Sequence, residues 1–195
     1  MNSKEIRKKI QCKAGDALII VDLQNDFLPP HGQLAVPEGR AVIEPLNQTI
    51  DLFHSQGLPI YATRDWHPAH HCSFKPQGGP WPDHCVAGTL GAEFSKDLRL
   101  PKTTQVVSKA TRPEQDAYSG FEGTDLKDQL TVAGVKRIFV GGLATDYCVL
   151  STVKDALRHG FEVILLEDAV RAVNVKPQDG VNAVAEMKEL GAKIL

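Results

Sequence analysis

The sequence predicts an α/β fold: a three-layer α/β/α sandwich with a mostly parallel central sheet. Short apolar runs with the length of buried strands alternate with stretches in which apolar residues recur at helical spacing. This alternation is typical of right-handed crossovers between parallel strands, which place helices on both faces of a sheet. The 195 residues contain no internal repeat or linker. We therefore expect one domain over 1–195, with 1–15 as a peripheral lead.

The individual elements follow from the apolar pattern. The run 17–22 is apolar up to a closing carboxylate, which is typical of a central parallel strand. From about 42 to 57, apolar residues mark one face of a helix that ends at a glycine. Further strands are expected over 58–63, 104–108, 135–140, 161–166 and 192–195, and further helices over about 124–133, 149–159 and 179–190.

A long irregular segment, 66–91, separates the second expected strand from the third. Segments of this length inside a compact domain are usually functional or disordered. Two tryptophans and four of the seven histidines fall within it, and this composition argues against disorder. We expect a functional loop.

Composition excludes several classes of function. The net charge is −2 and no basic run exceeds Arg7–Lys9, so neither nucleic acid nor an anionic membrane is expected as a partner. The longest apolar run, 17–21, is too short to span a bilayer, and the N-terminus lacks a signal-peptide core. The four cysteines show no C-x-x-C spacing, which fits a reducing compartment. We expect a cytoplasmic protein, and a homo-oligomer is compatible with this composition.

Polar side chains occur at the carboxyl ends of several expected strands. Asp22, Asp65 and Lys109 lie at the ends of the first three strands, and Cys148 lies at a strand-to-helix turn after the fourth. Open α/β sheets bind ligands at this edge, so these residues should meet at one site. Backbone N–H groups at a helix N-terminus favour negative charge, which should lower the pKa of the Cys148 thiol. The alternative for Cys148 is a buried structural cysteine.

Asp22, Lys109 and Cys148 together suit nucleophilic catalysis. A thiol must lose its proton before it attacks a carbonyl, and a carboxylate can accept that proton and return it to a leaving amine. A nearby ammonium stabilises the thiolate. The alternative is an ordinary ion pair between Asp22 and Lys109, since structural ion pairs also cluster.

Asp65, His67 and His84 are candidate metal ligands. Asp65 and His67 are two residues apart at a strand end, and His84 can return to the same ion from the long loop. One carboxylate and two imidazoles suit Zn²⁺, Mn²⁺ or Fe²⁺, with positions left for water or substrate. The alternative is a structural zinc site that uses Cys72 or Cys85.

Four segments of the chain resemble those of a known family. They are 17–27 (ALIIVDLQNDF), 64–68 (RDWHP), 81–85 (WPDHC) and 142–149 (GLATDYCV). In this order they resemble the nicotinamidase/pyrazinamidase branch of the isochorismatase-like cysteine hydrolases, over about 16–195. The first and last segments are shared across the superfamily, whereas the middle two are specific to this branch.

The resemblance implies a catalytic triad of Asp22, Lys109 and Cys148, with Cys148 as the nucleophile. It also implies a cis peptide bond between Leu143 and Ala144, which directs the N–H groups of Ala144 and Cys148 into an oxyanion hole.

The resemblance also assigns one divalent metal ion to Asp65, His67 and His84. Zinc is the first expectation, with manganese and iron as alternatives. His71 matches the position of a further histidine that ligates in some relatives and not in others.

The substrate pocket is the last feature that the resemblance implies. Phe27 and Trp81 match positions that flank a flat aromatic ring, and an aromatic sandwich suits a pyridine. Ala144 and Tyr147, near the nucleophile, are expected to line the same pocket. For Phe27, ordinary core packing is the alternative. Tyr118 is interpreted as structural support.

The expected activity is deamidation of nicotinamide to nicotinate and ammonia in NAD salvage, with pyrazinamide as a second substrate. One rival is a metal-free hydrolase of the same superfamily that acts on another small amide or an enol ether. Another is a non-enzymatic domain that binds a metal or ligand.

Overall fold

The central sheet has the parallel topology that the sequence predicts. The computed structural model describes residues 10–195, so residues 1–9 of the predicted lead lie outside the described residues. The described chain forms a six-stranded sheet in the order β3-β2-β1-β4-β5-β6, and all neighbouring strands are parallel. The strands are β1 (Asp16–Val21), β2 (Ile60–Asp65), β3 (Gln105–Lys109), β4 (Arg137–Leu143), β5 (Glu162–Arg171) and β6 (Lys193–Ile194).

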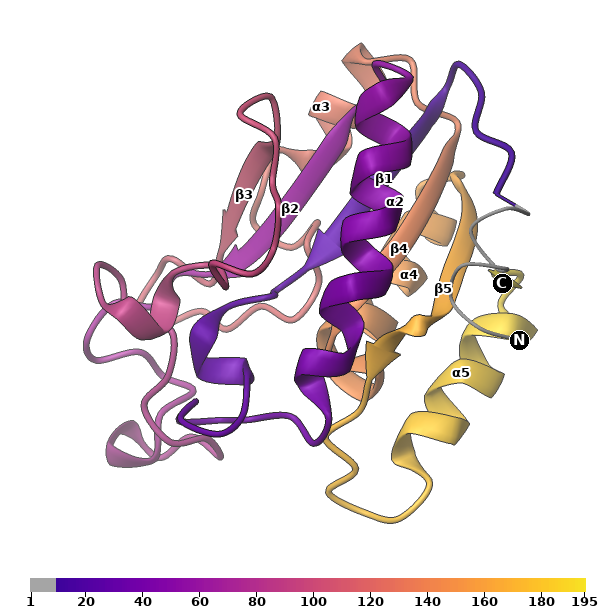
Figure 1. The fold of residues 1–195 in the computed structure, drawn as a ribbon. Helices are drawn as coiled ribbons and strands as arrows, with labels where there is room; N and C mark the ends of the chain where they lie inside the picture. Colours follow the sequence, from indigo (N-terminus) through magenta and orange to yellow (C-terminus); the bar gives the residue numbers. More distant parts are fainter. Residues whose placement is uncertain (1–9) are drawn as a thin grey trace.

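Helices cover both faces of this sheet (Figure 1), which confirms the three-layer architecture. The helix α2 (Ile43–Ser55) packs on one face, and α3 (Leu126–Val132), α4 (Leu150–Arg158) and α5 (Asp179–Glu189) pack on the other. No helix of residues 10–195 is long and apolar enough to cross a membrane.

The strand β1 lies between the two hydrophobic cores. Leu18 and Ile20 belong to the core on the α2 side, whereas Ile19 and Val21 belong to the core on the α3–α5 side. Successive side chains of a strand point to opposite faces, so a strand covered on both faces is apolar at every position. This burial explains the continuous apolar run at 17–21.

Three elements differ from their predicted bounds in ways that affect the site. The strand β2 continues to Asp65, so this carboxylate belongs to the strand itself. The strand β5 continues to Arg171 instead of ending at 166, with a register shift against β4 between Val140 and Gly142. Cys148 lies in a π-helical turn, Thr145–Val149, and α4 begins only after that turn.

The long loop 66–91 is fixed by its own backbone hydrogen bonds. The N–H of His67 donates to the carbonyl of Cys85 over 3.0 Å, and the N–H of Trp81 donates to the carbonyl of Ser73 over 3.0 Å. The loop lies beyond the carboxyl ends of β2 and β3, at the lower left of Figure 1. The expectation of an ordered loop is confirmed.

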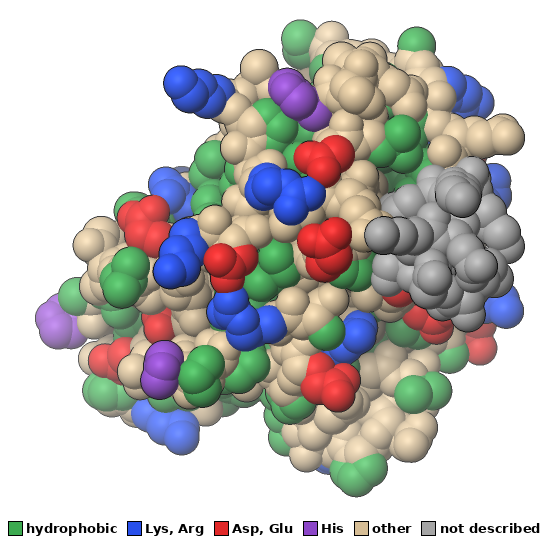
Figure 2. All heavy atoms as spheres, in the orientation of Figure 1, with side chains coloured by type: hydrophobic (Ala, Val, Ile, Leu, Met, Phe, Trp, Pro, Cys, Tyr) green, Lys and Arg blue, Asp and Glu red, His purple; other side chains and the backbone are tan. Residues whose placement is uncertain are grey.

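The outer side of α2 carries mixed charges, which Figure 2 shows on the front of the molecule. Arg99 pairs with Asp51 at 2.7 Å, which joins the segment 97–99 to the helix. Asn47, on the same helix, donates to the carbonyl of Asp97 and accepts from the N–H of Arg99. Exposed ion pairs contribute about 0–1 kcal/mol each to stability. The hydrogen bonds of the buried Asn47 amide are therefore the more important connection between the segment 97–99 and α2.

Gly142 permits the close approach of β4 to β1, and its replacement by alanine should destabilise the fold. Its φ is +128°, and a Cβ there would lie 2.1 Å from the carbonyl oxygen of Val21. We expect Gly142→Ala to lower the free energy of unfolding by about 3 kcal/mol or more, measured by urea titration. Gly160→Ala is the control, because Gly160 also has a positive φ (+85°) but open space around a Cβ, and it should cost about 1–2 kcal/mol. Equal losses in the two variants would show that backbone crowding at Gly142 is unimportant.

Candidate active site

The carboxyl edge of the sheet brings together the polar residues that the sequence places at strand ends. Asp65 and Lys109 are the last residues of β2 and β3 and are paired in the sheet register. Asp22 follows β1 directly, and its N–H donates to the carbonyl of Thr63 on β2 over 3.2 Å. Cys148 reaches the same place from the turn after β4. Residues from four strands therefore converge on one point.

The ammonium group of Lys109 occupies the centre of this cluster. Its Nζ lies 3.0 Å from Oδ2 of Asp22 and 3.5 Å from Sγ of Cys148, and it also pairs with Oδ1 of Asp65. A further hydrogen bond runs to the carbonyl of Ala117 over 3.1 Å. The Lys109 side chain is completely buried. A buried ammonium is tolerated only when it is paired and hydrogen bonded, as it is here.

The pKa values of the two carboxylates beside Lys109 are shifted in opposite directions. For Asp22, complete burial raises the pKa, although Lys109 and a 2.6 Å hydrogen bond from the Thr63 hydroxyl act in the opposite direction. Burial also favours the neutral form of Asp65, but Lys109 and His67 outweigh it and hold its pKa well below the usual range. For Lys109, burial is outweighed by both carboxylates, which raise its pKa well above the usual value. Asp65 is thus firmly ionised, and Asp22 is the carboxyl better suited to exchange a proton.

The expectation of a lowered thiol pKa at Cys148 is wrong. Burial raises the pKa of Cys148 well above its usual value, and Lys109 opposes this effect only in part because Asp22 and Asp65 also act on the thiol. One carboxylate oxygen of each aspartate lies within 4.8 Å of Sγ. The burial of the Cys148 thiol depends on how the folded chain packs, which the residues around the turn do not reveal. The resting thiol therefore keeps its proton and needs a base.

The turn before Cys148 has the predicted backbone geometry. The peptide bond between Leu143 and Ala144 is cis, which confirms the expectation drawn from the resemblance. The carbonyl of Ala144 accepts hydrogen bonds from the N–H groups of Tyr147 and Val149, both over 3.1 Å, so the turn closes on itself. Ala144 and Cys148 line the same pocket. Both residues expected to supply oxyanion donors therefore lie at the wall of this pocket.

Three side chains offer converging donor atoms that fit a divalent metal ion. Nε2 of His67 lies 3.6 Å and Nε2 of His84 lies 4.0 Å from Oδ2 of Asp65, and one donor atom from each residue falls within 4.8 Å of the others. Among the described residues, the buried Nε2 of His67 has no hydrogen-bond partner. Each histidine directs its Nδ1 to a backbone carbonyl: Ala110 for His67 at 3.3 Å and Pro82 for His84 at 2.8 Å. Such contacts orient imidazole ligands in metal sites.

His71 lies next to this group but does not present a donor atom to it. Its ring stacks on His67 with 4.2 Å between centroids. Its Nδ1 contacts the hydroxyl of Ser73 at 2.7 Å, and its Nε2 contacts the carbonyl of Gln115 at 3.1 Å. Both ring nitrogens are therefore engaged by the protein. The described geometry offers three ligands, and His71 supports the ring of one of them.

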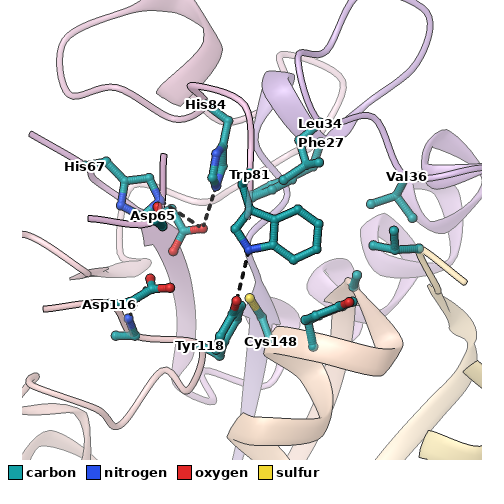
Figure 3. Close-up of a pocket in the computed structure, with 15 residues that line it drawn as sticks. Phe27, Leu34, Val36, Asp65, His67, Trp81, His84, Asp116, Tyr118 and Cys148 are labelled. Carbon is teal, nitrogen blue, oxygen red and sulfur yellow. Dashed lines mark hydrogen bonds and ion pairs between the residues drawn. The ribbon is translucent and has the colours of Figure 1, made fainter. Parts of the chain in front are cut away.

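A pocket opens above Cys148, and Figure 3 shows the residues around it. Asp65, His67 and His84 form one side, and apolar side chains form the other. All the predicted pocket residues line it: Phe27, Trp81, Ala144 and Tyr147. Phe27 is also 8% exposed and part of the core on the α2 side, so the packing alternative describes it equally well.

The aromatic side of the pocket is held by contacts that the sequence could not show. The indole N–H of Trp81 donates to the hydroxyl of Tyr118 over 2.9 Å, drawn as a dashed line in Figure 3. Tyr147 packs edge-on against Trp81 with ring centroids 5.2 Å apart. Its ring is tilted relative to that of Tyr118, with centroids 5.7 Å apart. Tyr118, interpreted from sequence as structural support, therefore also lines the pocket.

Sequence reasoning missed several other pocket residues. They are Leu34, Val36, Ser73, Asp116, Ala117 and Val173. Val173 follows β5, whose carboxyl end lies at the same sheet edge, so a strand predicted to its full length would have indicated it. Leu34 and Val36 lie in an irregular segment without a periodic pattern, and no comparable signal was present for them.

Known proteins are similar to this chain over most of its length. A model of the isochorismatase domain matches residues 16–195. The nicotinamidase of Escherichia coli (strain K12) is 40% identical, over 91% of this chain and 93% of its own. The nicotinamidase/pyrazinamidase of Mycobacterium tuberculosis (strain ATCC 25618 / H37Rv) is 38% identical, over 92% of this chain and 97% of its own.

Solved structures of similar proteins have the same fold. The pyrazinamidase of Pyrococcus horikoshii, in complex with zinc, superposes with a TM-score of 0.89 at 53% identity, over 93% of this chain and 98% of its own. PnC1 from L. infantum, in complex with nicotinate, has a TM-score of 0.86 at 39% identity, over 93% of this chain and 92% of its own. With a domain match over nearly its whole length, the chain belongs to the isochorismatase family, and its named relatives here are nicotinamidases and pyrazinamidases.

Proposed function

We propose that this chain is a metal-assisted cysteine amidohydrolase that converts nicotinamide and water to nicotinate and ammonia in NAD salvage. The observation that carries the proposal is a single pocket with Cys148 at its base and the donors of Asp65, His67 and His84 on one side. The relatives named nicotinamidase and the related structure with nicotinate support the choice of substrate. A relative named nicotinamidase/pyrazinamidase supports pyrazinamide as a second substrate.

The pocket divides substrate binding between a polar and an aromatic side. Asp65, His67 and His84 would hold a divalent metal ion, which would supply a Lewis-acid contact for the ring nitrogen, directly or through water. The zinc complex of the related pyrazinamidase supports zinc, with manganese and iron as alternatives. Phe27 and Trp81 hold the flat ring, and the carboxamide carbon faces Sγ of Cys148.

The first half of the reaction forms a thioester. Asp22 takes the thiol proton as Sγ of Cys148 attacks the carboxamide carbon, and Lys109, 3.5 Å from Sγ, stabilises the negative charge on sulfur. The oxygen of the resulting tetrahedral intermediate accepts hydrogen bonds from the N–H groups of Ala144 and Cys148. Asp22 then gives its proton to the departing nitrogen, and ammonia leaves as the thioester forms.

The second half of the reaction restores the thiol. Asp22, again ionised, takes a proton from a water molecule as its oxygen attacks the thioester carbon. The carbon–sulfur bond breaks and Asp22 returns its proton to the sulfur of Cys148. The carboxyl group keeps the second proton of the water and loses it to ammonia or solvent, which gives nicotinate. One water is consumed and one ammonia is released in each turnover. The same carboxylate thus moves a proton in both halves, which fits the raised pKa of Asp22.

Removal of the nucleophile should abolish turnover. We expect Cys148→Ala to lower ammonia release from nicotinamide by at least about 10³-fold, because no other group can form the thioester. Cys12→Ala is the control, since Cys12 does not line the pocket and the variant should retain full activity. Full activity in folded Cys148→Ala would exclude this mechanism. No ammonia from wild type with any small amide would favour a binding domain instead.

Removal of the metal should also stop the reaction. We expect dialysis against a strong chelator to lower activity at least about tenfold, and zinc, manganese or iron to restore it. His84→Ala should lose bound metal in elemental analysis, whereas His70→Ala should keep it because His70 is exposed and outside the pocket. Unchanged activity after verified metal removal would favour the metal-free alternative.

The acid limb of the pH profile should reflect Asp22. The base must be ionised to accept the thiol proton, and its ionised fraction falls as the pH drops through its pKa in the folded enzyme. Burial raises this pKa, so activity should be lost at a pH above the ordinary aspartate value of about 3.9. The measurement is kcat/KM from about pH 4 to pH 8, with circular dichroism at each pH to exclude unfolding. A folded enzyme with constant kcat/KM down to about pH 4 would contradict this role.

A further inference from the structure

Gln24 is a buried amide that binds the backbone of Asp65 at two points. Its Nε2 donates to the carbonyl of Asp65 over 2.7 Å, and its Oε1 accepts from the N–H of Asp65 over 2.8 Å. The same Nε2 donates to the carbonyl of Ala92 over 2.9 Å. Gln24 has no exposed surface and does not line the pocket. A side-chain amide can make about four hydrogen bonds. That of Gln24 makes three, all to the backbone of Asp65 and Ala92.

These two bonds replace a missing part of the sheet. The N–H and C=O of one strand residue point to the same side, and those of Asp65 point to the side of β1. The strand β1 ends at Val21, and the last backbone bond between these strands runs from Asp22 to Thr63. At Asp65, two residues further along β2, the side chain of Gln24 makes the bonds that a neighbouring strand would otherwise make.

The carboxylate held in this way lies between the ammonium of Lys109 and the two histidines. Oδ1 of Asp65 pairs with Lys109, and Oδ2 faces the two histidine Nε2 atoms. On its other side, β2 is paired with β3 as far as Lys109. Without the Gln24 side chain, the end of β2 would be held only by its pairing with β3. Metal ligands must be held within about 0.5 Å of their productive position, so a loosened backbone at Asp65 would weaken the whole donor set.

We propose that Gln24 is a positioning residue that fixes Asp65 for metal binding without touching metal or substrate. This inference rests on the metal ligands of the proposed function. The segment 24–28 also carries Phe27, whose N–H donates to the carbonyl of Gln24 over 3.2 Å. Gln24 therefore connects the metal side of the pocket to one of its aromatic walls.

The test compares Gln24→Met with Asn47→Leu. Both substitutions replace a buried amide that bonds backbone N–H and C=O groups by an apolar side chain of similar size, but Asn47 lies on α2, away from the pocket. The measurement is the dissociation constant of Zn²⁺, by competition with a chromogenic chelator, together with thermal unfolding of the metal-free proteins. We expect Gln24→Met to bind zinc about 10–100-fold more weakly than wild type, and Asn47→Leu to bind it within about threefold.

A second variant covers the case in which Gln24→Met does not fold. Gln24→Glu keeps the shape and the acceptor for the N–H of Asp65 but loses both donated hydrogen bonds, and it should also weaken zinc binding. Zinc affinity within threefold of wild type in the folded Gln24 variants, or an equal loss in Asn47→Leu, would overturn the inference. Wild type that binds zinc without releasing ammonia would reject the proposed function, whereas a selective loss of zinc in the Gln24 variants would still support Gln24 as a positioning residue. Wild type that binds no zinc would overturn both.

Discussion

The ammonium of Lys109 is the interaction on which the rest of the site depends. It lies between Asp22 and Asp65 with the Cys148 thiol beside it, and all four groups are buried. Two carboxylates around one ammonium leave the cluster with an excess of negative charge. This excess adds to the effect of burial, which is the main cause of the raised pKa of the Cys148 thiol beside the lysine. It also makes the Asp65 side of the cluster suitable for a divalent cation, since such an ion would offset the remaining charge.

The topology of the sheet explains how this cluster forms. The chain proceeds from β1 to β2 and β3 on one side and then returns to β4 on the other side of β1, so the strand order reverses next to β1. Crevices at such reversals are where open α/β sheets bind ligands. Asp22 and Cys148 follow the two strands that flank the reversal. Lys109, on β3, reaches them past Asp65 because its side chain is long enough to cross one strand. The ammonium of Lys109 therefore contacts both the Cys148 thiol and the Asp65 carboxylate.

The sequence predicts the parts of this arrangement that depend on strand position. Asp22, Asp65 and Lys109 could be predicted because each lies at the end of an expected strand, and parallel strands align their carboxyl ends. What depends on side-chain packing was not predictable. The raised pKa of Cys148 results from burial, and the bond from Trp81 to Tyr118 joins residues of two irregular segments. The role of Gln24 depends on where β1 stops pairing with β2, which apolar periodicity does not locate to a single residue.

The loop 66–91 and the sheet edge make separate contributions to the site. The loop supplies His67, Trp81 and His84. Backbone carbonyls orient the two histidine rings, whereas Trp81 packs against Tyr147 of the catalytic turn. The sheet edge supplies Asp22, Lys109 and Cys148, which are the acid/base, the cation and the nucleophile of the proposed mechanism. Changes in the loop would therefore alter which ring is held, whereas changes at the sheet edge would alter the chemistry itself. Asp65 is the exception, because it binds Lys109 with one oxygen and faces the histidines with the other. In the proposed mechanism, this one carboxylate therefore links the position of the substrate to the activation of the nucleophile, and the backbone that holds Asp65 matters to both.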